Sequence, residues 1–265
     1  MNKTKIEWCD STWNPVTGCL HGCEYCYARK IAERFGGMEP GMPKHRTGRN
    51  NVLYMPLCKE TKDGKSLAAP YPFGFDPTFH RHRLVEPNRK AIPQTIFVCS
   101  MADLFGNWVP DDWIEDVFAA CKSAPQHRYL FLTKNPVRYI RLSAAGKLPE
   151  DDNFWYGSTM TTQEDMYWWS ERHNTFISIE PLLEQINLNA DLQEHKVDWA
   201  IIGVMTGPGS KEHRPEREWI EDLAQDAKNT GIPVLMKNSV VPIVGEGNML
   251  REFPWTQRTE EAQRR

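Results

Sequence analysis

The chain has 265 residues, and its 32 lysines and arginines against 35 aspartates and glutamates give a formal net charge of −3 at pH 7. This charge excludes a global electrostatic attraction to nucleic acid or to anionic membrane, so any basic surface must be local. No apolar run approaches the roughly 18 residues that a membrane-spanning helix needs, and the N-terminal residues lack the apolar core of a signal peptide. We therefore expect a cytoplasmic protein with a single large domain over residues 1–265.

The first predicted elements surround a loop that contains three cysteines. A first strand is expected over residues 5–10, the cysteines lie within 19–26, and a helix is expected over 28–35. Residues 37–94 are rich in glycine, proline and basic residues, which indicates an irregular insertion with room for a small hairpin.

From residue 95 onward, short apolar runs alternate with amphipathic segments. This alternation predicts right-handed βαβ units and a parallel sheet, and near-continuous apolar strands indicate a sheet covered on both faces. The expected strands cover residues 95–101, 128–133, 154–160, 175–182, 197–205 and 232–238, and the expected helices cover 111–124, 135–146, 163–173 and 215–231.

About seven such units are too few for a closed eight-unit barrel. We therefore predict the α/β class, and within it a partial (open) (β/α)6 TIM-like barrel with an irregular insertion after the first βα unit. A doubly wound sheet is the alternative. The polar C-terminal tail, about 254–265, is expected to fray.

The cysteines Cys19, Cys23 and Cys26 have the spacing C-x3-C-x2-C. A total of seven cysteines in a reducing compartment argues against disulfides and favours a metal or catalysis. Structural zinc commonly takes four ligands in two pairs, and no second cysteine pair follows. An iron–sulfur cubane suits the spacing better, because three thiolates can hold three irons and leave the fourth open. Zinc remains the alternative.

With Tyr25 directly before the last cysteine, this loop resembles the signature of the radical S-adenosylmethionine superfamily. The resemblance implies that a [4Fe–4S] cluster on the three cysteines reductively cleaves S-adenosylmethionine to a 5′-deoxyadenosyl radical, which abstracts hydrogen from a substrate. It also implies an electron donor of the flavodoxin or ferredoxin type.

Wider strings resemble more narrowly a phage-associated family of unknown function that pairs with three-Cys-motif partner proteins. They are "SMADLFG" (100–106), "LTKNP" (132–136) and "SIEPLL" (178–183). One departure is that residues 204–206 read Val-Met-Thr where that family typically has Gly-Glu-Ser. The missing acidic residue keeps open a partner-dependent subunit that binds a cluster without turnover.

Candidate ligand-binding residues follow from topology, because ligands of parallel α/β proteins bind at the carboxyl ends of the strands. The resemblance implies that Ser100 and Asp103 face the methionine moiety and that Ser158 and Glu180 face the sulfonium or ribose. Some of these residues could instead cap the following helix. The predicted cofactor-binding residues are Tyr25, Ser100, Asp103, Lys134, Ser158 and Glu180.

Two lysines, Lys134 and Lys237, also stand at predicted strand ends, where they could bind a carboxylate or a phosphate. The basic strings at 44–49 and 79–84, with aromatic residues around them, have the composition of a nucleic-acid surface. We therefore expect nucleic acid or a nucleotide as the substrate. Solvated loops are the alternative, as is a zinc-stabilised nucleic-acid-binding module without redox chemistry.

Overall fold

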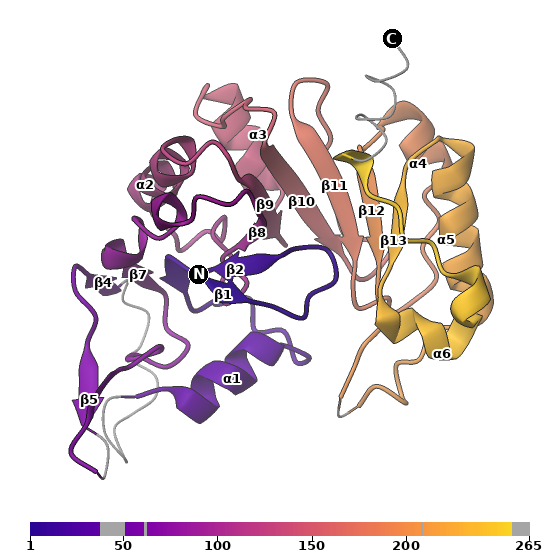
Figure 1. Ribbon diagram of the computed structural model, residues 1–265. Helices are drawn as coiled ribbons and strands as arrows, with labels where there is room; N and C mark the ends of the chain where they lie inside the picture. Colours follow the sequence, from indigo (N-terminus) through magenta and orange to yellow (C-terminus); the bar gives the residue numbers. More distant parts are fainter. Residues whose placement is uncertain (38–50, 61–62, 208, 256–265) are drawn as a thin grey trace. The chain divides into compact units, whose positions relative to one another are not determined.

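The computed structural model describes residues 1–37, 51–60, 63–207 and 209–255 (Figure 1). The chain divides into two compact units, Met1–Leu148 and Pro149–Arg265, and each is described by itself. In the described parts of the chain, no helix is both long enough and apolar enough to cross a membrane.

Four strands in linear order form the sheet of unit 1. The short β1 pairs antiparallel with β2, and the pairs β2–β8 and β8–β9 are parallel. Every residue of β8 is buried, as expected for a strand covered on both faces. The strands are β1 (Asn2–Lys3), β2 (Ser11–Trp13), β8 (Thr95–Val98) and β9 (Arg128–Thr133).

The strand expected over residues 5–10 is wrong, because the two strands at this end of the chain cover Asn2–Lys3 and Ser11–Trp13 and the residues between them form turns and irregular chain. Asp10 explains the shift. Its backbone N–H donates to the Thr95 carbonyl over 2.8 Å, and its carboxylate accepts the Thr95 N–H over 2.7 Å. These two bonds cap the start of β8 and set the register of the strand that follows Asp10.

The described residues of unit 1 include three α-helices, and all three confirm the sequence prediction to within two residues. They are α1 (Tyr27–Phe35), α2 (Asp111–Lys122) and α3 (Val137–Ala144). In α2, Asp111 and Asp112 in the first turn favour the positive end of the helix dipole, and Trp113 and Val117 bury one face.

The expected insertion contributes two strands to a second, small sheet, whose remaining strand, β3, precedes the cysteine loop. The strands of this sheet have the order β3–β7–β4, and the hairpin β5–β6 confirms the small hairpin expected in the insertion. The bounds are β3 (Val16–Thr17), β4 (Asn51–Leu53), β5 (Cys58–Glu60), β6 (Ser66–Ala68) and β7 (Thr78–His80), followed by the 3-10 turns η1 (Arg81–Arg83) and η2 (Pro87–Arg89).

Unit 2 has four strands that pair in parallel in the order β10–β11–β12–β13 (Figure 1). Ile220, Leu223 and Ala227 of α5 pack into its core. The strands are β10 (Phe154–Met160), β11 (Asn174–Ile179), β12 (Trp199–Ile202) and β13 (Val234–Met236), with α4 (Asn189–Glu194), α5 (Arg217–Asn229), α6 (Val241–Val244), η3 (Asn238–Val240) and η4 (Glu246–Asn248).

The helix expected over residues 163–173 is wrong, because these residues form turns and irregular chain. The Asp165 carboxylate accepts the backbone N–H groups of Thr161 and Thr162 over 2.7 and 3.0 Å. Ser158 Oγ accepts the Trp168 N–H over 3.0 Å. Within the segment, the Ser158 hydroxyl therefore takes the Trp168 N–H, which a helix would bond to the carbonyl four residues earlier.

The α/β class with mostly parallel strands is confirmed. Within the described residues, the strand order of each unit is linear, so neither unit closes into a barrel.

Candidate functional site

The cysteine loop, residues 19–26, begins at a backbone position that only glycine can occupy. Gly18 has φ +87°, and a Cβ there would lie 2.3 Å from the Asp76 carbonyl oxygen. The Gly18 N–H donates to the Met101 carbonyl over 2.9 Å, and the Cys19 N–H donates to the Phe75 carbonyl over 3.2 Å. These two backbone hydrogen bonds therefore fix the start of the loop close to the end of β8.

The three loop cysteines are free thiols of intermediate exposure. Cys26 caps α1, since its Sγ accepts the Arg29 N–H over 3.4 Å. Cys19 and Cys26 pack against the same small cluster of Ala28, Ala32, Phe75 and Met101. Two of the three thiols are thus oriented by contacts of the fold.

The pKa of the Cys19 thiol is raised to about 12, chiefly because burial disfavours the thiolate and further because Asp103, Cys26 and Cys23 add negative charge nearby. Cys19 is therefore protonated at neutral pH. A bound metal would have to displace this proton, as is general for thiolate ligation.

The donor set consists of three thiols on one loop, the ligand type that an iron–sulfur cubane takes. Among the residues described, no three His, Cys, Asp or Glu side chains are placed to hold one metal ion. Structural zinc needs four ligands around one ion. In a cubane each thiolate binds a different iron, so Cys19, Cys23 and Cys26 would be the residues that hold such a cluster here.

Asp103 lies behind the loop and is only 5% exposed. Its Oδ2 lies 2.7 Å from Nε2 of His21, the loop residue that lies between Cys19 and Cys23 in the sequence. The same oxygen accepts the Lys134 N–H over 3.0 Å. The Thr133 hydroxyl donates to both carboxylate oxygens over 2.8 and 2.9 Å. The carboxylate therefore contacts the cysteine loop and the end of β9.

Ser100 follows a strained residue at the end of β8. Cys99 has φ +60°, which is unusual for a residue other than glycine and concentrates at functional sites. Asn14 Oδ1 accepts the Ser100 hydroxyl over 3.2 Å and the Met101 N–H over 2.9 Å. The Tyr27 hydroxyl donates to the Ser100 carbonyl over 2.7 Å. Ser100 is thereby placed next to the first turn of α1.

Lys134 extends from the end of β9 to the cysteine loop. Its Nζ lies 5.4 Å from the centre of the Tyr25 ring, a cation–π contact. The structure therefore brings Tyr25, Ser100, Asp103 and Lys134 together with the three cysteines in unit 1.

The other two predicted residues, Ser158 and Glu180, lie in unit 2. Ser158 is fully buried, and its Oγ accepts the Trp168 N–H. Glu180 forms an ion pair with Lys237. A Cβ on Gly203 would lie 2.9 Å from the Glu180 carboxyl carbon and 3.0 Å from Cδ of Lys237, so glycine makes room for the pair.

Sequence reasoning missed the roles of Asn14, His21, Thr133 and Gly203. The contact of His21 with Asp103 joins residues 82 positions apart. Local spacing contains no signal for such a contact. For Gly203, the signal is its place inside the strand expected over 197–205, since a glycine within a strand often marks a site of close approach.

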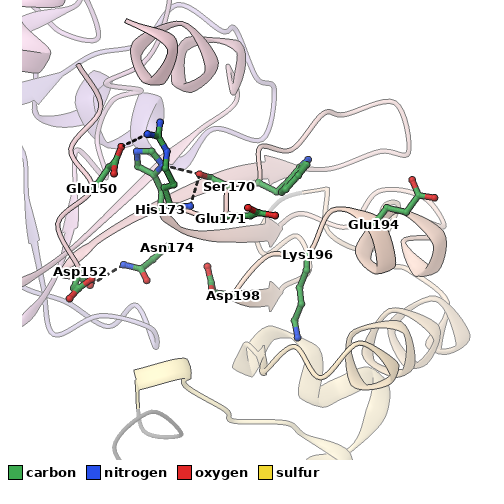
Figure 2. A pocket seen from close by; sticks show the side chains of 11 residues that line it. Glu150, Asp152, Ser170, Glu171, His173, Asn174, Glu194, Lys196 and Asp198 are labelled. Carbon is green, nitrogen blue, oxygen red and sulfur yellow. Dashed lines mark hydrogen bonds and ion pairs between the residues drawn. The ribbon is translucent and has the colours of Figure 1, made fainter. Parts of the chain in front are cut away.

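A cavity of about 390 Å³ in unit 2 is lined by charged residues (Figure 2). It lies at the amino ends of the strands, since Asn174 begins β11 and Asp198 precedes β12. Arg172 pairs with Glu150 over 3.2 Å, and Asp198 accepts the Thr175 N–H over 2.9 Å. These contacts cap strands and hold loops, and none of the predicted site residues lines the cavity.

Comparison with known proteins adds a family and little else. A mutant of spore photoproduct lyase shares 11% identity with this chain, covering 99% of this chain and 74% of that chain, with a TM-score of 0.45. A likeness this weak assigns neither fold nor activity. No curated protein matches the chain. A family model described as "Protein of unknown function (DUF5131)" matches residues 3–241, most of the chain, and the protein therefore belongs to this family.

Proposed function

We propose that this protein is a radical S-adenosylmethionine enzyme whose [4Fe–4S] cluster is held by Cys19, Cys23 and Cys26. The observation that supports this most directly is the set of three free thiols at C-x3-C-x2-C spacing on one loop between the first parallel strand and α1. When bound, the cluster and S-adenosylmethionine would supply a 5′-deoxyadenosyl radical that abstracts hydrogen from a substrate. The architecture proposed with it is the partial (β/α)6 barrel.

Lys134 is proposed to bind an anionic group above the cysteine loop. In unit 2 the equivalent strand-end cation, Lys237, is neutralised by Glu180. Lys134 instead has its ammonium over the ring of Tyr25, and within the described residues it forms no ion pair with a carboxylate. Its charge is thus available for the carboxylate of S-adenosylmethionine or for a phosphate of the substrate.

Ser100, Ser158 and Glu180 are proposed as further cofactor contacts. The Ser100 hydroxyl already donates to Asn14, so it offers its remaining acceptor capacity to a ligand amino group. The Glu180 carboxylate, partly exposed and oriented by Lys237, can accept ribose hydroxyls. Ser158 is fully buried, and its proposed contribution is to shape the end of β10.

Nucleic acid or a nucleotide is the proposed substrate, on the composition of the sequence. The basic string at 44–49 lies outside the described residues. The string at 79–84 gives no support, because Arg81 pairs with Asp116 and Arg83 donates to two backbone carbonyls.

An electron donor of the flavodoxin or ferredoxin type and a three-Cys-motif protein are the proposed partners. For the donor, α1 offers a surface beside the loop on which Tyr27, Ile31 and Phe35 are exposed at helical spacing. Lys30 and Arg34 on the same helix are exposed and would favour an acidic donor.

The test is turnover by the anaerobically reconstituted protein. With dithionite as reductant, we expect S-adenosylmethionine to give 5′-deoxyadenosine, and DNA or RNA to raise the rate. A Lys134→Met variant should raise the KM for S-adenosylmethionine or for the nucleic acid. Full cluster loading without any 5′-deoxyadenosine would contradict the proposed activity.

A further inference from the structure

The Asp103 carboxylate has a complete set of partners inside unit 1. Oδ1 accepts the Phe105 N–H over 2.9 Å and shares the Thr133 hydroxyl with Oδ2. Oδ2 also accepts from the Lys134 N–H and contacts His21. A carboxylate offers about four lone-pair positions, so these contacts leave none for a ligand.

The contact with His21 has a defined direction. A carboxylate is an acceptor only, so Nε2 of His21 must be the donor over the 2.7 Å between them. The imidazole also lies edge-on to Trp108, with ring centres 4.9 Å apart. The imidazole thus contacts both Asp103 and Trp108, and its side chain is 22% exposed.

We propose that Asp103 is a positioning residue that ties the cysteine loop to the end of β9, with His21 as its contact on the loop. The link would hold Cys19 and Cys23 at a fixed place relative to Lys134, whose backbone N–H bonds the same carboxylate. Its purpose rests on the proposed function, since a fixed loop is needed only if the thiols bind a group. The tie itself is a property of the metal-free protein.

Hydrogen exchange of the metal-free chain tests this tie. The Cys19 and Cys26 amides are bonded to the Phe75 and Cys23 carbonyls and report opening of the loop. In a His21→Ala variant, which leaves the buried carboxylate in place, we expect both amides to exchange on the order of tenfold faster, the factor that one hydrogen bond to a charged group supplies. Asp103→Asn should do the same.

A double variant distinguishes coupling from independent damage. If His21 holds the loop only through Asp103, the His21→Ala/Asp103→Asn protein should exchange at the rate of the single variants, about tenfold and not about a hundredfold above wild type. The matched control is Asp198→Asn in unit 2, where a carboxylate also accepts a strand N–H. It should leave Cys19 and Cys26 unchanged.

Two results would overturn the proposal. One is unchanged exchange at Cys19 and Cys26 in His21→Ala, a variant whose fold circular dichroism can verify. The other is an exchange rate in the double variant about a hundredfold above wild type, which would mean that the two substitutions act independently. Failure of the wild-type protein to bind iron would instead remove the proposed function and leave the exchange result standing. In loaded protein, His21→Ala should also change the electron paramagnetic resonance spectrum of the reduced cluster.

Discussion

At Gly203 the backbone passes so close to the Glu180–Lys237 ion pair that a methyl group would have to displace one of the two side chains. We therefore expect Gly203→Ala to lower the free energy of unfolding by about 1–3 kcal/mol, the usual cost of overpacking. Urea denaturation measures this. Gly247→Ala is the control, because nothing lies within 4 Å of a Cβ there, and it should change stability by less than about 0.5 kcal/mol. Equal effects of the two substitutions would show that the crowding has no energetic consequence.

His80 is buried in β7, where its Nε2 lies 2.9 Å from the Thr17 hydroxyl. Burial, followed by the charges of Arg83 and His82, lowers the pKa of His80 to about 2. The unfolded chain takes up a proton near pH 6.5 and the folded protein does not. His80 therefore contributes stability that is present above about pH 6.5 and is lost as the pH falls.

We expect wild-type protein to lose about 1 kcal/mol through this residue between pH 7 and pH 5.5. His80→Gln removes the titrating group and keeps a polar atom near Thr17, so its stability should fall less steeply over that range. Unfolding free energies of both proteins at the two pH values provide the test. Parallel losses in the two proteins would contradict a neutral buried His80.

At the scale of elements, the bounds of the buried strands were predictable from the sequence, whereas those of one partly exposed segment were not. β9 and β10 have the bounds expected for them, because their apolar runs are continuous and all seven residues of β10 are buried. The segment 163–173 has apolar residues at helical spacing as well, yet it is not helical. The Ser158 hydroxyl accepts the Trp168 N–H inside the segment, and the Asp165 carboxylate accepts the N–H groups of Thr161 and Thr162 just before it. These side-chain bonds compete with the helix.

The same segment supports a prediction about Asp165. Its carboxylate accepts two backbone N–H groups and the Thr161 hydroxyl, so Asp165→Ala leaves those donors without their acceptor. We expect a loss of about 1–3 kcal/mol in thermal or urea unfolding. Asp165→Asn keeps one acceptor oxygen and should lose less. A neutral Asp165→Ala variant would mean that water replaces the carboxylate at no cost.

The cysteine loop was predictable, but the way it is held was not. The spacing of Cys19, Cys23 and Cys26 is local, and the helix that follows begins where expected. The resemblance implies that Asp103 faces the methionine moiety. Its bonds to His21 and Thr133 link residues 82 and 30 positions apart, and only the folded chain shows that they meet.

At the scale of the whole molecule, the family match over residues 3–241 runs through both units. Candidate residues occur in each unit, the cysteine loop and Lys134 in unit 1 and Glu180 in unit 2. A family of unknown function supplies no activity for them, so the account depends on whether the three thiols hold a cluster. The other proposals, on S-adenosylmethionine, electron donor and substrate, follow from that point.

Iron and sulfide content after anaerobic reconstitution tests it most directly. If the three thiols hold a [4Fe–4S] cluster, we expect about four irons and four sulfides per chain of wild-type protein. Cys23→Ala should bind well below one cluster per chain, whereas Cys58→Ala, which removes an exposed cysteine outside the motif, should match wild type. Wild-type protein that binds no iron, or a Cys23→Ala variant that binds as much as wild type, would contradict the account.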